Sequence, residues 1–226
     1  MTLANLVVPA FLVFWTLIVI VPLVIVAVFS FFDVKFYQIV YEPTLNTWRS
    51  LIDSGRWLVA LKTFRITVTI TLIELVLALP FALWLAKGCK SKPAKAIFLT
   101  LLTVPFFLEV SSRIIVWRPV LGTNGIVNVI LMQIGVVDQP VEWLLYSEFA
   151  VHFGLLGTYF PTMVFPIFMS ISLIDDDLLA ASKDLGGNGA QTFMNIVLPL
   201  ALPGIIVGIV FTSVPLMATF VESQLL

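Results

Sequence analysis

Five long apolar stretches alternate with shorter polar segments along the chain. They cover residues of about 6–32, 66–86, 96–117, 149–174 and 196–221. Each reaches the roughly 20 residues that a helix needs to cross about 30 Å of hydrocarbon. Backbone amides in lipid have no water partner, and alternating strand-like segments are absent from the sequence. The pattern therefore predicts five membrane-spanning helices in one transmembrane domain over residues 1–226.

The polar segments between these stretches are predicted to be loops. The segment 33–65 carries two tryptophans, a residue type that favours the membrane interface. The segment 118–148 contains an apolar, helix-like run from Ile126 to Ile134 that is too short to span a membrane. The segment 175–195 is polar and rich in glycine.

A short basic loop predicts the orientation of the chain. Residues 87–95 carry four lysines, which favours the cytoplasm for this loop and for the N-terminus. The count of basic residues over the whole chain does not support this orientation, because several of them would then lie outside. The dense short loop is taken as the stronger indicator. The residues on which the two indicators depend are Lys87, Lys90, Lys92, Lys95 and Lys183 inside, and Lys35, Arg49, Arg56 and Arg118 outside.

Composition excludes several classes of protein. The 226 residues are 60% hydrophobic and 11% charged, with a mean hydropathy of +1.10, against about 25% charged residues in soluble domains. A net charge of −1 gives no footprint for a nucleic-acid partner. A single Cys89 and a single His152 exclude an internal disulfide and a multi-histidine metal site. They also leave no nucleophile and base set for a membrane enzyme.

The segment 175–195 has a specific internal order. Three aspartates open a predicted short helix from Asp177 to Leu185, and Gly186 and Gly187 end it. A second short amphipathic piece then leads to Pro199 at the membrane surface. These residues predict a helix-turn-helix across the cytoplasmic mouth of the bundle, although a polar segment of this kind in a membrane protein is more often a simple connector.

This run resembles the EAA loop of the permease subunits of ABC importers, which has the pattern E-A-A-x-x-x-G-x(9)-I-x-L-P. The spacing matches without a gap, and two further residues before the glycine are usual companions in that family. The family's glutamate falls on Ala180 and its second alanine on Ser182, and losing the acid weakens one polar contact of this loop. The matching residues are Ala181, Asp184, Leu185, Gly186, Ile196, Leu198 and Pro199.

The resemblance implies a type I ABC importer transmembrane domain whose cytoplasmic coupling helix docks on a separate ATPase. It implies a second permease subunit, an extracytoplasmic solute-binding protein and a bacterial or archaeal plasma membrane. No G-x-x-x-x-G-K-[ST] loop occurs in the sequence. The chain is therefore expected to carry no cofactor, with ATP and magnesium bound by the partner ATPase.

Three segments resemble the spermidine/putrescine branch of these permeases: Val104–Arg113, Gly122–Asn128 and Pro215–Val221. The branch also contains importers of iron, thiamine, phosphonates and opines, so polyamine is the leading substrate among several. Permeases of this family continue into a sixth helix, and this sequence ends after the fifth predicted span. The expectation is a chain without the sixth span, and a truncated subunit that does not transport stays open as an alternative.

Two acids in the predicted spans are candidates for the translocation path. A charge at mid-membrane costs about 2.5–3.5 kcal/mol on insertion scales, so Glu74 and Glu109 need partners or a polar cavity. Arg113 follows Glu109 by four residues, which predicts an ion pair on one helix face. The alternative is that Glu109 and Arg113 line the path. Glu74 has no basic residue at these spacings, so either a neighbouring helix satisfies it or it faces the path.

Overall fold

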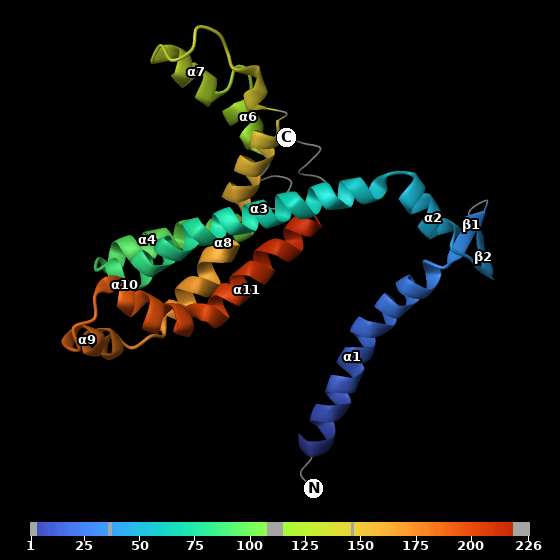
Figure 1. Cartoon of the computed structure of the whole chain (residues 1–226), viewed down its shortest axis with the longest axis horizontal. Coiled ribbons are helices and arrows are strands. Elements are labelled where there is room, and N and C mark those ends of the chain that lie inside the picture. Colours follow the sequence, from blue (N-terminus) through green and yellow to red (C-terminus); the bar gives the residue numbers. More distant parts are fainter. Residues whose placement is uncertain (1–3, 36–37, 108–114, 146, 219–226) are drawn as a thin grey trace. The chain divides into compact units, whose positions relative to one another are not determined.

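The structure is a computed structural model that describes residues 4–35, 38–107, 115–145 and 147–218 (Figure 1). The chain divides into two compact units, Met1–Lys62 and Thr63–Leu226. Almost all regular structure in the described residues is helical, which confirms the predicted class of α-helical membrane protein. Among these residues, four helices are long and apolar enough to cross a membrane: Val8–Phe29, Arg56–Gly88, Glu148–Ser172 and Gly189–Met217.

These four helices cover the first, second, fourth and fifth apolar stretches of the sequence. The third stretch begins in α4 (Lys92–Thr103) and continues as a 3-10 turn over Val104–Phe107, at Pro105. Residues 108–114 of this stretch lie outside the described residues. The division of the chain into five spans therefore stays a prediction.

The first unit contains α1 (Ala4–Phe29), a β-hairpin and the short helix α2 (Asn46–Asp53). Strands β1 (Phe32–Lys35) and β2 (Gln38–Pro43) pair antiparallel. The sequence did not predict this hairpin. None of the side chains of the apolar span Val8–Phe29 is buried in the described part of the chain, so the surface of this span is available to lipid or to another protein.

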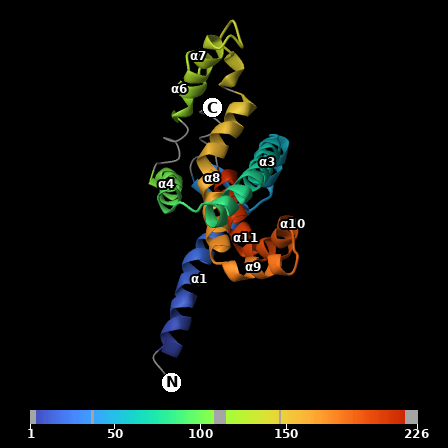
Figure 2. The ribbon, with the colours of Figure 1, turned by 90° about the vertical axis from the view of Figure 1, so that its left-hand side faces the viewer.

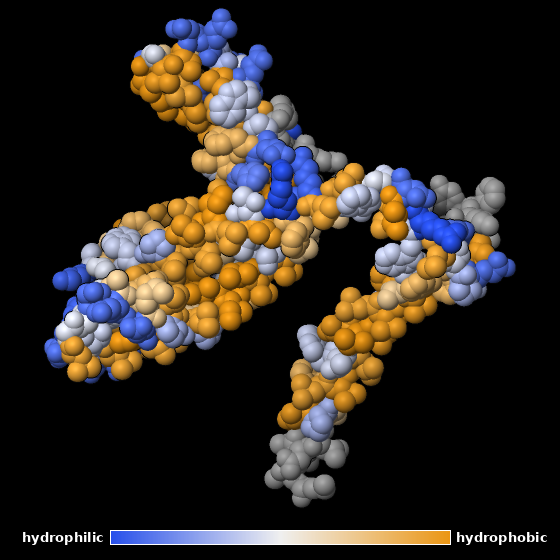
Figure 3. Space-filling view, viewed as in Figure 1, coloured by the Kyte–Doolittle hydropathy of each residue, from blue (hydrophilic) through white to orange (hydrophobic). Residues whose placement is uncertain are grey.

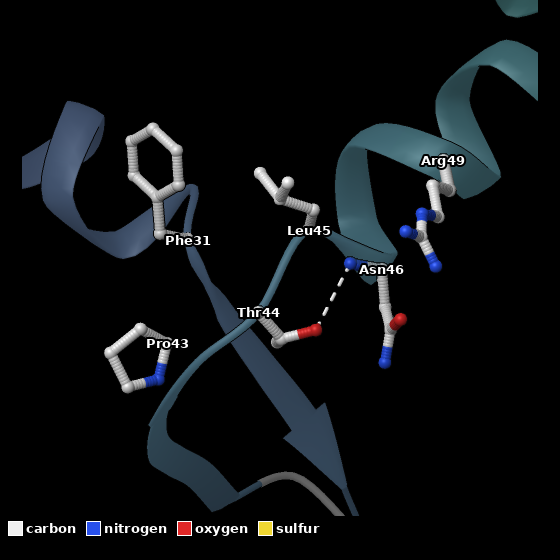
Figure 4. A pocket seen from close by; sticks show the side chains of 6 residues that line it. All are labelled: Phe31, Pro43, Thr44, Leu45, Asn46 and Arg49. Carbon is white, nitrogen blue, oxygen red and sulfur yellow. Dashed lines mark hydrogen bonds between the residues drawn. The ribbon is translucent and has the colours of Figure 1, made fainter.

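The α2 helix is tied to the hairpin in the segment that was predicted to lie at the membrane interface. The Asn46 side-chain amide donates a hydrogen bond to Asp33 Oδ2 at 3.0 Å. The rings of Phe31 and Trp48 are in contact, with centroids 6.2 Å apart. A hollow of about 420 Å³ lies beside these contacts (Figure 4). It is lined by Phe31, Pro43, Thr44, Leu45, Asn46 and Arg49.

The second unit begins within α3. The α3 helix begins ten residues before the predicted start at residue 66, because its first turns carry polar side chains that continue the helix beyond the apolar stretch. It ends in a π-helical turn, η1. In chain order the elements are α3 (Arg56–Leu83), η1 (Trp84–Gly88), α4, η2 (Val104–Phe107), α6 (Trp117–Leu121), α7 (Ile126–Gln133), η3 (Glu142–Leu144), α8 (Glu148–Ser172), α9 (Asp176–Asp184), α10 (Gly189–Thr192), η4 (Phe193–Val197) and α11 (Leu198–Met217).

Helices α8 and α11 pack closely side by side (Figures 1 and 2). Two glycines on one face of α11 allow this approach. A Cβ atom at Gly204 would meet the carbonyl oxygen of Pro166, and one at Gly208 would lie 3.0 Å from the carbonyl oxygen of Met163. Small residues at such positions let helix backbones come together in a membrane. The core beside this contact includes Ala78, Ala82, Leu85, Met163, Ile167, Ile171, Ala201 and Ile205.

The segment between α6 and α8 is held by a buried asparagine. The Asn128 side-chain amide donates to the carbonyl oxygens of Gly122 and Val141, at 3.0 and 3.2 Å. Its side-chain oxygen accepts a hydrogen bond from the Val141 amide at 2.8 Å. Asn128 lies in α7, the short non-spanning helix predicted from the run that begins at Ile126. The hydrogen bonds of the Asn128 side chain therefore hold the segment between α6 and α8 together.

Candidate functional site

The predicted coupling helix is present as α9, which begins and ends one residue before the predicted bounds. The side chain of Asp175 caps it by accepting a hydrogen bond from the Asp177 amide at 3.0 Å. Asp176 and Asp177 lie in the first turn and Lys183 in the last, which complements the helix dipole at both ends. The polar residues of this segment therefore specify the helix without any buried side chain in α9.

A glycine turn ends α9 as the sequence predicted. Gly186 has φ +80°, in the left-handed region that L side chains rarely adopt. A Cβ atom at Gly187 would lie 2.8 Å from the backbone oxygen and from the hydroxyl oxygen of Ser182. Gly186 is therefore required for its conformation and Gly187 for a close approach.

The second helix of this helix-turn-helix, α10, begins with a capping box. The Asn188 side chain accepts from the Gln191 amide, and the Gln191 side chain accepts from the Asn188 amide, both at 2.9 Å. These bonds start α10, which continues through the π-helical turn η4 into α11. The hydroxyls of Ser182 and Thr192 are 2.8 Å apart and connect α9 to α10.

The outer surface of this helix-turn-helix offers apolar groups to a partner. Leu185 is 90% exposed, and Leu178 is also exposed. They border a groove of about 320 Å³ that continues along α10 and η4. Figure 3 shows polar residues gathered around α9, at the end of a mostly apolar flank. The groove is lined by Leu178, Ala181, Ser182, Leu185, Gly187, Gln191, Asn195 and Ile196.

The remaining motif residues lie near this groove along the same stretch of chain. Ala180 and Asp184 are exposed on α9, and Pro199 is exposed in the first turn of α11. Leu198 is half-buried and packs against the core beside α8 and α11. These two motif residues of α9 are therefore exposed, whereas Leu198 anchors the start of α11 in the core. We refer to α9 and α10 together as the exposed arm.

A lysine of the short basic loop contacts this arm, and the sequence analysis did not anticipate the contact. Lys87 Nζ donates to the carbonyl oxygen of Ile174 at 2.5 Å and to Asp176 Oδ1 at 2.6 Å. The hydrogen bond from Lys87, together with its charge, holds the pKa of the Asp176 carboxyl below its ordinary value. Lys95 donates to the Ala86 carbonyl oxygen at 3.1 Å and lies over the ring of Phe168.

These contacts place two loops at one end of the second unit. Lys87 connects the basic loop 87–95 to the segment 175–195. Arg65, in the first half of α3, and Glu148, at the start of α8, form an ion pair at 3.1 Å. The basic loop and the helix-turn-helix therefore lie on the same side, as the predicted orientation requires.

Glu74 lies on the buried face of α3. The residue is 0% exposed, and among the described residues neither of its carboxylate oxygens has a hydrogen bond. Within the same part of the chain, the hydroxyls of Thr67 and Thr71 are also buried without a hydrogen-bond partner, and they share the helix face of Glu74. On α11, Thr212 lies close enough to interact with the Glu74 carboxyl, and its hydroxyl is 3.0 Å from that of Thr162 on α8.

Glu74 and Thr212 thus bring polar groups of α3 and α11 together inside the bundle, and Thr162 of α8 joins them through its contact with Thr212. The sequence identified Glu74, and the spacing of Thr67, Thr71 and Glu74 was a readable signal for its helix face. The contributions of α8 and α11 had no such signal. The other two candidates for the path, Glu109 and Arg113, lie outside the described residues. Among the residues that the structure describes, no group of three or more His, Cys, Asp and Glu side chains could hold a metal ion.

Comparisons with known proteins agree with this geometry. Residues 73–226 match a family described as the binding-protein-dependent transport system inner membrane component. The chain is 36% identical over 194 residues to the spermidine/putrescine transport system permease protein PotB of Escherichia coli, covering 86% of this chain and 69% of that protein.

Two further relatives extend the comparison. PotB of Haemophilus influenzae is 31% identical over 212 residues, covering 92% of this chain and 72% of that protein. The inner membrane ABC transporter permease protein YdcU of Escherichia coli is 28% identical over 209 residues, covering 87% of this chain and 66% of that protein. The chain therefore spans about two thirds of the length of these relatives.

Proposed function

Because the chain belongs to the family of binding-protein-dependent transport system inner membrane components, we propose that it is the permease subunit of an ATP-driven ABC importer. Its relatives are bacterial inner-membrane permeases, so the chain is an inner-membrane transport component and not an enzyme. The observation that carries the proposal is the exposed arm of α9 and α10, which bears the family's coupling motif beside an open groove.

We propose a polyamine of the spermidine/putrescine class as the substrate. The permeases most similar in sequence include those named for spermidine and putrescine transport, at 36% and 31% identity. A buried carboxylate needs a cation or a proton near it, and polyamines carry ammonium groups. Glu74, with the hydroxyls of Thr67, Thr71 and Thr212 near it, therefore suits one amine of such a substrate.

Glu74 is enclosed in the conformation described by the structure, so a substrate reaches it only after the helices around it separate. The proposed path includes Glu109 and Arg113, with the Glu109–Arg113 ion pair as the alternative for these two residues. In either case Glu74 is the acid whose surroundings must change between the closed and open states.

The proposed partners follow from the exposed arm. A separate ATPase would bind the apolar tip formed by Leu178 and Leu185, and would hold ATP and magnesium. A second permease subunit would complete the pore, and an extracytoplasmic solute-binding protein would deliver the substrate. The bilayer covers the apolar flanks.

Reconstitution tests this function. The chain is co-expressed with the proposed ATPase, second permease and binding protein, purified through a tag on the chain, and placed in vesicles. We expect the ATPase to copurify and labelled spermidine or putrescine to accumulate only with ATP and the binding protein. Accumulation of iron, thiamine, a phosphonate or an opine instead would reject the polyamine substrate. An assembled complex that moves none of these solutes would reject the importer and favour a non-transporting subunit.

A further inference from the structure

Lys87 connects the end of the continuous helix formed by α3 and η1 to the start of α9. Its ammonium contacts the carbonyl oxygen of Ile174 and the carboxylate of Asp176, residues that are far from it in the sequence. The Lys87 side chain is 18% exposed, whereas that of Asp176 is 82% exposed. The lysine stem is therefore packed within the protein, and its charged end reaches outward to two fixed acceptors.

The two acceptors are a backbone carbonyl oxygen and a carboxylate, and each lies close to the end of a helix. Ile174 follows the C-terminus of α8, where unpaired carbonyl groups give a partial negative charge. Asp176 lies in the first turn of α9, where the helix dipole favours an acid. Hydrogen bonds from an ammonium to such groups are charge-assisted and stronger than neutral ones. A single cation thus connects η1, the junction after α8, and α9.

The attachment of α9 depends on few contacts. No side chain of α9 is buried, and the helix exposes most of its surface. Ser182 connects it to α10, and the half-buried Leu179 packs against the core. Lys87 adds a polar connection from α9 to the helix formed by α3 and η1. A force applied to the exposed tip of α9 therefore has a direct route to that helix.

We propose that Lys87 and Asp176 are positioning residues that transmit the displacement of α9 to α3 during the transport cycle. The proposal rests on the proposed importer function, in which a partner ATPase moves α9. Glu74 lies thirteen residues before Lys87 on the same continuous helix, about 20 Å away at 1.5 Å per residue. Movement of this helix by the Lys87 contact therefore changes the enclosure of Glu74.

Removal of the charge tests the contact. The Lys87→Met variant keeps most of the length and apolar packing of the side chain and removes the ammonium. Lys90→Met is the matched control, because Lys90 is an exposed lysine of the same loop. The double variant Lys87→Asp and Asp176→Lys restores an ion pair with reversed charges.

The measured quantity is the number of substrate molecules transported per ATP hydrolysed in reconstituted vesicles. We expect Lys87→Met to retain its ATPase partner and to lower this ratio by about fivefold or more, within the usual range of coupling between sites. The reversed pair should recover part of the loss, and Lys90→Met should match the wild type. If the wild type transports and Lys87→Met has the same ratio as Lys90→Met, the transmission proposal is wrong.

A distance measurement tests the contact without depending on transport. Spin labels on the native Cys89 and on a Lys183→Cys variant report the separation of η1 and α9 in the assembled complex. With Lys87 present, we expect one narrow distance distribution that is retained when a non-hydrolysable ATP analogue is added. With Lys87→Met, the distribution should broaden or shift with nucleotide. Equal distributions with and without Lys87 would overturn the proposal, whereas failure of the wild type to transport would overturn only the importer function.

Discussion

The hydroxyls of Ser182 and Thr192 meet at 2.8 Å across the glycine turn that separates α9 from α10. Thr192 also donates to the carbonyl oxygen of Asn188 at 3.1 Å, within the capping box. Ser182 stands where the family pattern has its second alanine, so this bond is a feature that the pattern's alanine could not make. The bond holds α9 and α10 against each other.

Replacement of Ser182 measures the contribution of that bond. The Ser182→Ala variant loses one partly exposed hydrogen bond, and Thr192 keeps its bond to Asn188. We expect a loss of about 1 kcal/mol or less in stability, and faster amide exchange in α9 than in α11. Hydrogen exchange of the detergent-purified chain checks this, with Ser172→Ala, at the exposed end of α8, as the control. Equal exchange of α9 in both variants would contradict the role of the bond.

The conformation of Gly186 gives a sharper prediction for coupling. A side chain at φ +80° is strained by about 1–2 kcal/mol, so Gly186→Asp should reorient the arm. We expect the variant to insert into the membrane normally and to lose substrate-stimulated ATP hydrolysis in reconstituted vesicles. Gly189→Asp is the matched control, because a Cβ atom there meets nothing within 4 Å and the residue starts α10. Full stimulation in Gly186→Asp would refute the prediction.

The close contact of α8 and α11 predicts a stability effect far from the coupling segment. A Cβ atom at Gly204 would meet the backbone of Pro166, which has little freedom to move. We expect Gly204→Ala to lower the free energy of unfolding by about 1–3 kcal/mol, as overpacking does. Thermal unfolding in detergent measures it, with Gly189→Ala as the control. An unchanged midpoint of thermal unfolding would contradict this prediction, because the two helices would then accommodate the added Cβ atom without loss of stability.

The buried position of Glu74 predicts a transport effect without loss of the fold. Glu74→Gln keeps the shape of the side chain and removes its charge. We expect polyamine uptake to fall about tenfold or more, because the loss of a hydrogen bond to a charged group costs about 1.5–3 kcal/mol. Uptake in vesicles tests this, with Glu142→Gln, an exposed acid, as the control. Normal uptake in both Glu74→Gln and Glu109→Gln would reject the proposed path.

The contact of Lys87 with Asp176 predicts a pH dependence. Because Lys87 holds the pKa of the Asp176 carboxyl below its ordinary value of 3.8, the contact contributes fully above about pH 3.8. Its contribution is lost as the pH falls through the lower pKa of the folded state. A carbon-13 NMR titration of labelled aspartate should show the Asp176 pKa rising toward 3.8 in Lys87→Met. The same pKa in both proteins would contradict the contact.

The local features of this fold could be read from the sequence, and the long-range ones could not. Four of the apolar stretches form long helices, and Asp175, Gly186 and Gln191 each act through neighbours within three residues or through their own backbone. The contact of Lys87 with Asp176 joins residues on separate helices, so no local pattern indicates it. Glu74 was visible as a charge in an apolar run, whereas Thr212 of α11, and Thr162 of α8 beside it, come near Glu74 only through the packing of the helices.

The lack of buried side chains in α9 has a consequence for the evolution of the protein. In the proposed importer, a substitution on the outer face of α9 changes the surface offered to the ATPase, while the packing of the bundle stays the same. Ala180, at the family's glutamate position, is exposed and is a change of this kind. Partner specificity can therefore drift in this helix through single substitutions that leave folding intact, and compensating changes are expected in the partner and not in this chain.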